Sequence, residues 1–145
     1  MGVTLAVVPM TATPAGSPMD RSSPHYELAF TDQSGYLRAD VSGEHDSVAI
    51  STAYWSEIAQ RCRETGVRKL LVVEQLEQKA TLGDTVEIVD ALVALGFKDI
   101  VIAYVDLNED AALLSHTDLL AKWAGLRGRT FSRVQPAIEW LLAAG

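Results

Sequence analysis

The spacing of hydrophobic residues changes period along the chain, and each change marks an expected element. Between Tyr26 and Phe30, apolar side chains alternate with small or polar ones, which is typical of a half-buried β-strand. Residues 36–41 resume this alternation after a turn-rich segment in which Gly35 is free to adopt a positive φ. We therefore expect a β-hairpin over residues 26–41.

A helical period follows this hairpin. Trp55, Ile58, Ala59 and Cys62 are spaced at i, i+3, i+4 and i+7, so they lie on one face of an α-helix. Gly66 is a typical residue to follow the end of such a helix. Polar residues that suit a helix start precede the pattern, namely Asp46, Ser47 and Ser51.

Two runs of consecutive apolar residues, Leu70–Val73 and Ile100–Val105, predict strands that are buried on both faces. A second helix is expected between them, from about Asp84 to a stop at Gly96. The apolar face of this helix is made by Val86, Val89, Leu92 and Val93.

The C-terminal part of the chain predicts three more elements. These are a third helix over residues 111–124, a short strand over residues 130–134, and a last helix in which Pro136 takes the first position. The expected order is therefore β-β-α-β-α-β-α-β-α. Such an order predicts an α/β fold with a mostly parallel sheet, an antiparallel edge hairpin, and helices on both faces.

The 145 residues are enough for one domain with a sizeable core. Residues 11–24 are rich in Pro, Gly, Ser and Thr, which is a linker composition. We expect a tail or linker over residues 1–24 and a single domain over residues 25–145. Alternatively, residues 3–8 add an edge strand to this molecule or to a neighbouring copy, which would give a homodimer.

Charge excludes several partner classes. The chain has 12 Lys and Arg against 19 Asp and Glu, a net charge of -7. This balance argues against binding to nucleic acid or to an anionic membrane surface. No apolar stretch approaches the roughly 18–20 residues of a transmembrane helix, and no signal peptide is recognised, so we expect a cytoplasmic protein without membrane insertion. Cys62 is the only cysteine, which excludes an intramolecular disulfide.

No motif for catalysis is found in the sequence. The segment after Leu70–Val73 lacks the glycine spacings that cradle phosphates. Glu44, His45 and Asp46 form the densest group of ligand-type residues, but adjacent residues rarely converge on one metal ion. Cys62 lies on an apolar helix face, where a thiol is usually inert. We therefore expect no catalytic residue, no cofactor, no metal and no enzymatic activity.

Two residue groups are candidates for binding. Four of the basic residues lie within a dozen positions and could bind an anion or an acidic partner, although cations at helix and strand ends are common: Lys122, Arg127, Arg129 and Arg133. All three tryptophans fall on expected apolar helix faces, where core packing is the default and a ligand pocket is the alternative: Trp55, Trp123 and Trp140.

Three segments together resemble a known family. They are residues 35–44, Lys69–Glu74, and residues 131–141, the last of which contains an Ala-x-x-Trp-Leu phrase ending at Leu141. Over residues 25–145 the chain resembles the SpoIIAA-like branch of the STAS domains. This is a family of anti-sigma-factor antagonists that borders on the CRAL-TRIO lipid-binding domains.

The resemblance implies a small non-enzymatic α/β module that docks onto a protein partner or holds a small ligand between its helices. In phosphorylated members of the family, a Ser follows an Asp where the helix after the central strand begins. This chain has Thr85 after Asp84 instead, and Asp84 also suits a helix cap. The residues that the resemblance marks as a regulatory or interaction site are Thr81, Gly83, Asp84 and Thr85.

Two functions remain open on the sequence alone, with an uncharacterised enzyme as a third. A regulatory or protein-interaction module of STAS type predicts an exposed apolar patch on the second helix and no enclosed cavity. A carrier of a small apolar or lipid-like ligand predicts a cavity of several hundred Å³ between the helices and the sheet.

Overall fold

The computed structural model describes residues 21–22, 26–45, 48–78, 82–107, 117–118 and 120–144. The strand expected over residues 3–8 lies outside these residues, as does half of the helix expected over residues 111–124. Within that helix, residues 117–118 and 120–123 are helical.

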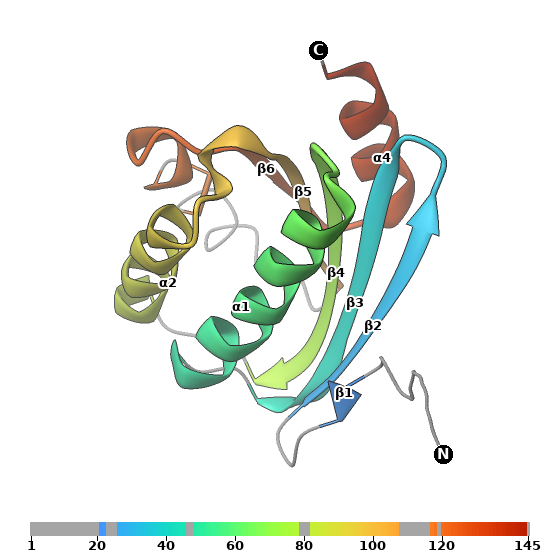
Figure 1. Ribbon diagram of the computed structural model, residues 1–145. Helices are drawn as coiled ribbons and strands as arrows, with labels where there is room; N and C mark the ends of the chain where they lie inside the picture. Colours follow the sequence, from blue (N-terminus) through green and yellow to red (C-terminus); the bar gives the residue numbers. More distant parts are fainter. Residues whose placement is uncertain are drawn as a thin grey trace.

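In the described part of the chain, six strands form one sheet, and their order in the sheet follows their order in the chain. The first three strands pair in antiparallel fashion, and the third to sixth pair in parallel (Figure 1). The strands are β1 (Arg21–Ser22), β2 (Tyr26–Gln33), β3 (Tyr36–His45), β4 (Lys69–Gln78), β5 (Val101–Asp106) and β6 (Arg127–Phe131). The predicted fold class is confirmed, with the β2–β3 hairpin beside a parallel half-sheet.

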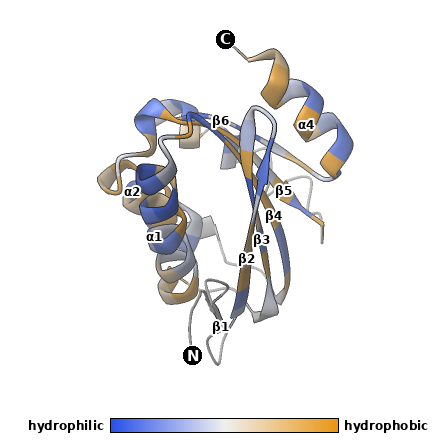
Figure 2. Cartoon of the chain, turned by 45° about the vertical axis from the view of Figure 1, so that its right-hand side comes forward, coloured by the Kyte–Doolittle hydropathy of each residue, from blue (hydrophilic) through white to orange (hydrophobic). Residues whose placement is uncertain are grey.

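Helices cover both faces of the sheet. They are α1 (Val48–Thr65), α2 (Leu82–Ala94), the short 3-10 helix η2 (Phe97–Asp99) and α4 (Val134–Ala143). Connections between parallel strands are almost always right-handed, so the helices in successive connections lie on the same face of the sheet. This rule accounts for α1 and α2 lying together on one face. The chain then returns after β6, so α4 packs against β4, β5 and β6 from the opposite side (Figure 2). We call these two sides the α1–α2 face and the α4 face.

The alternating side chains of the central strands explain their continuous apolar runs. On β4, Leu70 and Val72 belong to the core under α1 and α2, whereas Leu71 and Val73 belong to the core under α4. Because both faces of such a strand are buried, its sequence does not alternate between apolar and polar residues. Alternation therefore also decides toward which core a polar residue on these strands points.

The face expected for α1 is confirmed, because Trp55, Ile58, Ala59 and Cys62 are all buried. The face expected for α2 is only partly right. Val89 and Leu92 are buried, but Val86 is 41% exposed. The helix begins at Leu82, two residues before the expected start, and it packs against α1.

Two boundaries near the C-terminus differ from expectation. The last strand is Arg127–Phe131 rather than residues 130–134, because Val134 already begins α4. Pro136 is consequently the third residue of α4 rather than the first. A proline is tolerated throughout the first turn, since the N–H groups there have no partner within the helix.

Within the described residues, no helix combines the length and the apolar character that crossing a membrane requires. Arg21 and Ser22, in the segment expected to be a tail, pair with β2 as the short strand β1. The domain boundary at residue 25 stays a prediction.

Candidate functional site

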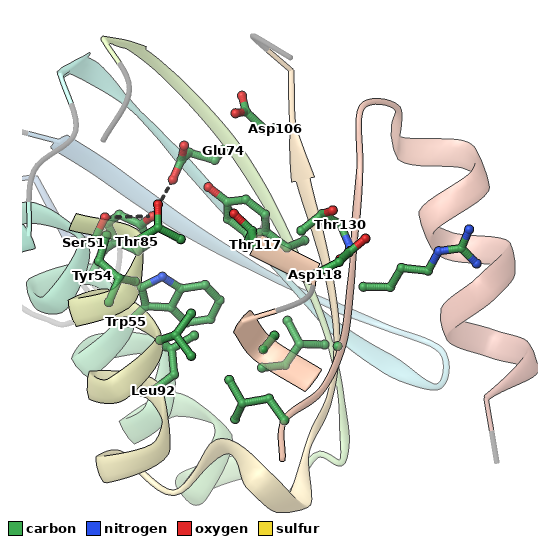
Figure 3. A pocket seen from close by; sticks show the side chains of 18 residues that line it. Ser51, Tyr54, Trp55, Glu74, Thr85, Leu92, Asp106, Thr117, Asp118 and Thr130 are labelled. Carbon is green, nitrogen blue, oxygen red and sulfur yellow. Dashed lines mark hydrogen bonds between the residues drawn. The ribbon is translucent and has the colours of Figure 1, made fainter. Parts of the chain in front are cut away.

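A partly enclosed pocket lies on the α1–α2 face, above the parallel strands β4, β5 and β6 (Figure 3). Its walls come from α1, from α2 and from the segment that contains residues 117–121. The pocket volume is about 100 Å³. It is therefore smaller than the several hundred Å³ expected for a carrier of a small apolar or lipid-like ligand.

Two buried carboxyl groups define one end of this pocket. Glu74 on β4 and Asp106 on β5 are paired residues of adjacent parallel strands, with 3% and 4% of their surface exposed. Each lies an even number of residues after a side chain of the α1–α2 core, Leu70 and Ile102 respectively, so each points to the same face. Both lie toward the carboxyl ends of the strands, where open α/β sheets place their ligand sites.

Tyrosine hydroxyls surround the carboxylate of Glu74. The Tyr54 hydroxyl donates to Oε2 of Glu74 at 2.5 Å, and the Ser51 hydroxyl approaches that of Tyr54 at 3.5 Å (Figure 3). Burial raises the pKa of Tyr104 well above its ordinary value, and the charge of Glu74 and a hydrogen bond to it raise this pKa further. Tyr104 is therefore a neutral donor at physiological pH, and Glu74 is an acceptor shared by two tyrosines.

The opposite end of the pocket is apolar. Val89 and Leu92 of α2, Ile102 of β5 and Leu126 line it. Figure 3 shows Leu92 at the end of the pocket remote from Glu74 and Asp106. The helix direction explains this polarity, since α2 begins near the carboxyl ends of the strands and runs back along them.

Aromatic rings form the wall between the two ends. The rings of Trp55 and Tyr104 are stacked with centroids 6.2 Å apart, and Tyr54 lies 5.8 Å from Trp55. Phe97 contacts Trp55 edge-on at 5.3 Å and supports it from outside the pocket. Large rings that brace one another in this way hold a wall in a fixed position.

On the β6 side of the pocket, Gly128 lies close to the backbone of Ile102. A Cβ atom added to Gly128 would lie 3.3 Å from the backbone oxygen of Ile102, which is closer than most real contacts. Asp118 accepts a hydrogen bond from the backbone N–H of Thr130 at 2.7 Å. This bond occupies part of the β6 edge and fixes residues 117–118 against the sheet.

The pocket is acidic. Its described charged lining residues are Glu74, Asp106, Asp118 and Arg129. The Arg129 guanidinium, however, lies 5.4 Å over the ring of Phe131, which packs in the core of the α4 face. Arg129 thus contributes its backbone to the pocket and its charge to the other side of the sheet. Among the described residues, no group of three or more His, Cys, Asp and Glu could hold a metal ion.

The three tryptophans do not share one site. Trp55 lines the pocket, whereas Trp140 packs 5.8 Å from Phe131 on the α4 face. Trp123 is 83% exposed, so its expected place in the core is wrong. Of the helical residues 120–123, only Leu120 and Ala121 pack against the core.

The residues marked by the family resemblance are partly described. Thr81 lies outside the described residues, while Gly83 and Asp84 belong to the first turn of α2 rather than preceding it. Thr85 is 7% exposed and lines the pocket. This position makes Thr85 a pocket residue, and its regulatory role stays a prediction.

Three of the four candidate basic residues lie close together. Lys122, Arg127 and Arg129 line a second, shallower depression beside Trp140, and Arg133 is exposed just before α4. The convergence supports a basic patch, although its binding role stays a prediction. Cys62 is buried, and burial raises its pKa from 9.0 to about 11, which makes its thiol unreactive.

The acidic end of the pocket was missed in the sequence. Glu74 follows the apolar run Leu70–Val73, and Asp106 follows Ile100–Val105, so both resemble ordinary polar ends of strands. The signal that could have found them is the pairing of two strands whose continuous apolar runs are each followed by an acid. Parallel neighbours bring such residues together at one edge.

Comparisons with known proteins bear on the fold. No protein-family model matches the chain, and no curated protein matches it either. One similar solved structure is an uncharacterised protein of the DUF3478 family from Shewanella loihica PV-4, which is described as having a SpoIIAA-like fold. It matches with a TM-score of 0.54 and 10% identity, over 86% of this chain and 99% of that chain. This likeness confirms at the level of the fold the resemblance found in the sequence: the chain has a SpoIIAA-like fold.

Proposed function

We propose that this protein is a non-enzymatic binding module that holds a small ligand in the pocket on the α1–α2 face. The observation that carries the proposal is the polarity of the pocket, which has two buried carboxyl groups at one end and aliphatic side chains at the other. Sites for small molecules combine mostly apolar walls with a few placed polar groups in this way.

The cost of the acidic end supports this proposal. Taking a carboxylate out of water costs several kcal/mol, and a second carboxylate beside it adds like-charge repulsion. Glu74 and Asp106 occupy positions that an apolar residue would fill without this cost, next to Val72 and Tyr104 on the same face. Groups that are costly to the fold are concentrated at functional sites.

Native mass spectrometry of the full chain, purified gently from its own cells, tests the proposal. We expect a mass above that of the polypeptide, and we expect organic extraction to remove it. A bare polypeptide mass would contradict the proposal.

A pocket-blocking variant makes the test specific. Ala121 lines the pocket, and Ala121→Phe would fill much of its volume. Ala53 is exposed on α1, so Ala53→Phe is a control of the same chemistry. We expect the extra mass to disappear in Ala121→Phe and to persist in Ala53→Phe. Its persistence in both variants would place the ligand elsewhere.

One observation favours a second function, docking onto a protein partner through α2. Val86 is 41% exposed on this helix, next to the segment that the family resemblance marks as an interaction site. Val86→Glu should abolish the capture of a specific partner from native cells, whereas Ala53→Glu should not. Equal capture by both variants would contradict docking at this surface.

A further inference from the structure

We propose that the ligand of this pocket is a small amphipathic cation, in which a primary ammonium group is joined to a short apolar body. This inference rests on the proposed function and adds the chemical class of the ligand. The ammonium binds between Glu74 and Asp106, and the apolar body lies along Ile88 and Val89 of α2.

The geometry of the acidic end suits a compact cation. Paired residues of adjacent parallel strands have their side chains about 5 Å apart, so one compact cation reaches both Glu74 and Asp106. An ammonium group has three donors and no acceptor, which matches two acceptor carboxylates. Both carboxyl groups are almost fully buried, and the attraction between opposite charges is much stronger there than in water.

The aromatic wall of the pocket also suits a cation. The rings of Tyr54, Trp55 and Tyr104 all line the pocket, and Trp55 stacks on Tyr104 within it. The faces of such rings attract cations through their quadrupoles, and the attraction increases when water is excluded. Carboxylates and ring faces together favour a cation over a neutral group of the same size.

The remaining charges around the pocket disfavour an anion. Asp118 is a further acid in the lining, and the Arg129 side chain stacks on Phe131 on the far side of the sheet. An anionic ligand would therefore meet repulsion in the pocket. The Thr85 hydroxyl at the same end adds a polar group but no charge.

The size of the pocket sets the length of the apolar body. Thr85 and Val89 both line the pocket and are one turn of α2 apart, which is about 6 Å along the axis. A cavity of about 150 Å³ accommodates a benzene molecule, so the volume of about 100 Å³ suits about four or five non-hydrogen atoms. n-Butylammonium fits both limits, with its nitrogen at the acids and its chain beside α2.

The experiment is a titration of the full chain with three probes of nearly the same shape, followed by the methyl NMR signals of Ile88 and Val89. The probes are n-butylammonium, n-butanol and butanoate. We expect the cation to bind at least about tenfold more tightly than the alcohol, as for a group that gains charge-assisted hydrogen bonds. We expect butanoate to bind more weakly than either.

Three isosteric variants show which groups cause the preference. Glu74→Gln and Asp106→Asn each remove one negative charge from the pocket, whereas Asp90→Asn removes one from the exposed side of α2. We expect each pocket variant to lose about tenfold in affinity for the cation while its affinity for butanol stays within about twofold. Asp90→Asn should bind all three probes as the wild type does. If one pocket variant does not fold, the other one decides.

The outcomes separate this inference from the proposed function. Butanol or butanoate binding as tightly as the cation, with shifts at Ile88 and Val89, would overturn the cationic ligand and leave the pocket as a site. Unchanged cation affinity in both folded pocket variants would also overturn it. If none of the probes shifts these methyl signals, the inference fails, whereas the proposed function is decided separately by the native mass spectrum of the wild type and Ala121→Phe.

Discussion

Glu74 on β4 and Asp106 on β5 face each other across two paired parallel strands, and both side chains are buried on the α1–α2 face. Tyr54 reaches this pair from α1 and donates to Glu74 at 2.5 Å. The pairing of β4 with β5 thus places both acids in the pocket. Consecutive strands, placed side by side, bring two acids that are 32 positions apart in the sequence to one site.

The Tyr54 hydrogen bond should contribute measurably to stability. Tyr54→Phe leaves the buried Glu74 carboxylate with one donor fewer, so we expect the free energy of unfolding to fall by about 1–3 kcal/mol. Tyr36→Phe, at a partly buried tyrosine on the α4 face, should change it by less than about 0.5 kcal/mol. Urea denaturation measures both variants. An equal small effect in the two would contradict the assigned role of Tyr54.

The burial of Thr85 predicts a sharp contrast with its neighbour in the chain. Thr85→Glu introduces a carboxylate into the acidic pocket, and we expect it to destabilise the fold by at least about 2 kcal/mol. Val86→Glu places the same group on an exposed position and should cost no more than about 0.5 kcal/mol. A thermal melt compares the two. A regulatory site open to phosphorylation at Thr85 would instead tolerate the glutamate.

Trp55 and Trp123 should also differ in their contribution to stability, because one is buried and the other is exposed. Trp55→Ala should lower the free energy of unfolding by about 3–5 kcal/mol, because it removes a ring braced by Phe97 and Tyr104. Trp123→Ala should change it by less than about 0.5 kcal/mol, since the ring is mostly exposed. Chemical denaturation of each variant checks this. A large loss in Trp123→Ala would show that residues 120–123 are packed differently.

Cys62 predicts a pH dependence of stability. Burial raises its pKa from 9.0 to about 11, so the folded protein holds the thiol proton more tightly than the unfolded chain does. The resulting stabilisation is complete below pH 9 and is lost as the pH rises toward 11. Each pKa unit is equivalent to about 1.4 kcal/mol, so we expect a loss of about 2 kcal/mol between pH 8 and about pH 10.5.

The Cys62→Ala variant isolates this contribution. Its stability should fall less steeply over the same pH range, by about the same 2 kcal/mol, whatever its absolute stability. Tyr104 also holds its proton more tightly in the folded state, but it is present in both proteins. Identical pH slopes for the wild type and Cys62→Ala would contradict the burial of the thiol.

Periodicity made most of the fold predictable. Trp55, Ile58 and Cys62 show their burial directly in their spacing, because one helix face meets one core. The run Leu70–Val73 shows that both sides of a strand are covered, which required helices on both faces. These patterns are local, and the sequence records them completely.

The pocket could not be predicted in the same way, because it depends on contacts between distant segments. Nothing near Glu74 indicates that α1 supplies a tyrosine to it or that α2 covers it. Trp123 shows the converse, since its helical spacing is apolar although its side chain is 83% exposed. Local spacing reports which side of an element is apolar, and only the tertiary arrangement determines how much of that side is buried.

The central claim is that a cation-headed ligand binds between Glu74 and Asp106. Intermolecular NOEs from n-butylammonium to the full chain, measured with the carboxyl carbon shifts, test it most directly. We expect NOEs from the butyl chain to Val89 and Trp55, together with shifts of the Glu74 and Asp106 carboxyl carbons. NOEs confined to the α4 face, at Phe131 and Trp140, or carboxyl carbons that do not move, would contradict the account.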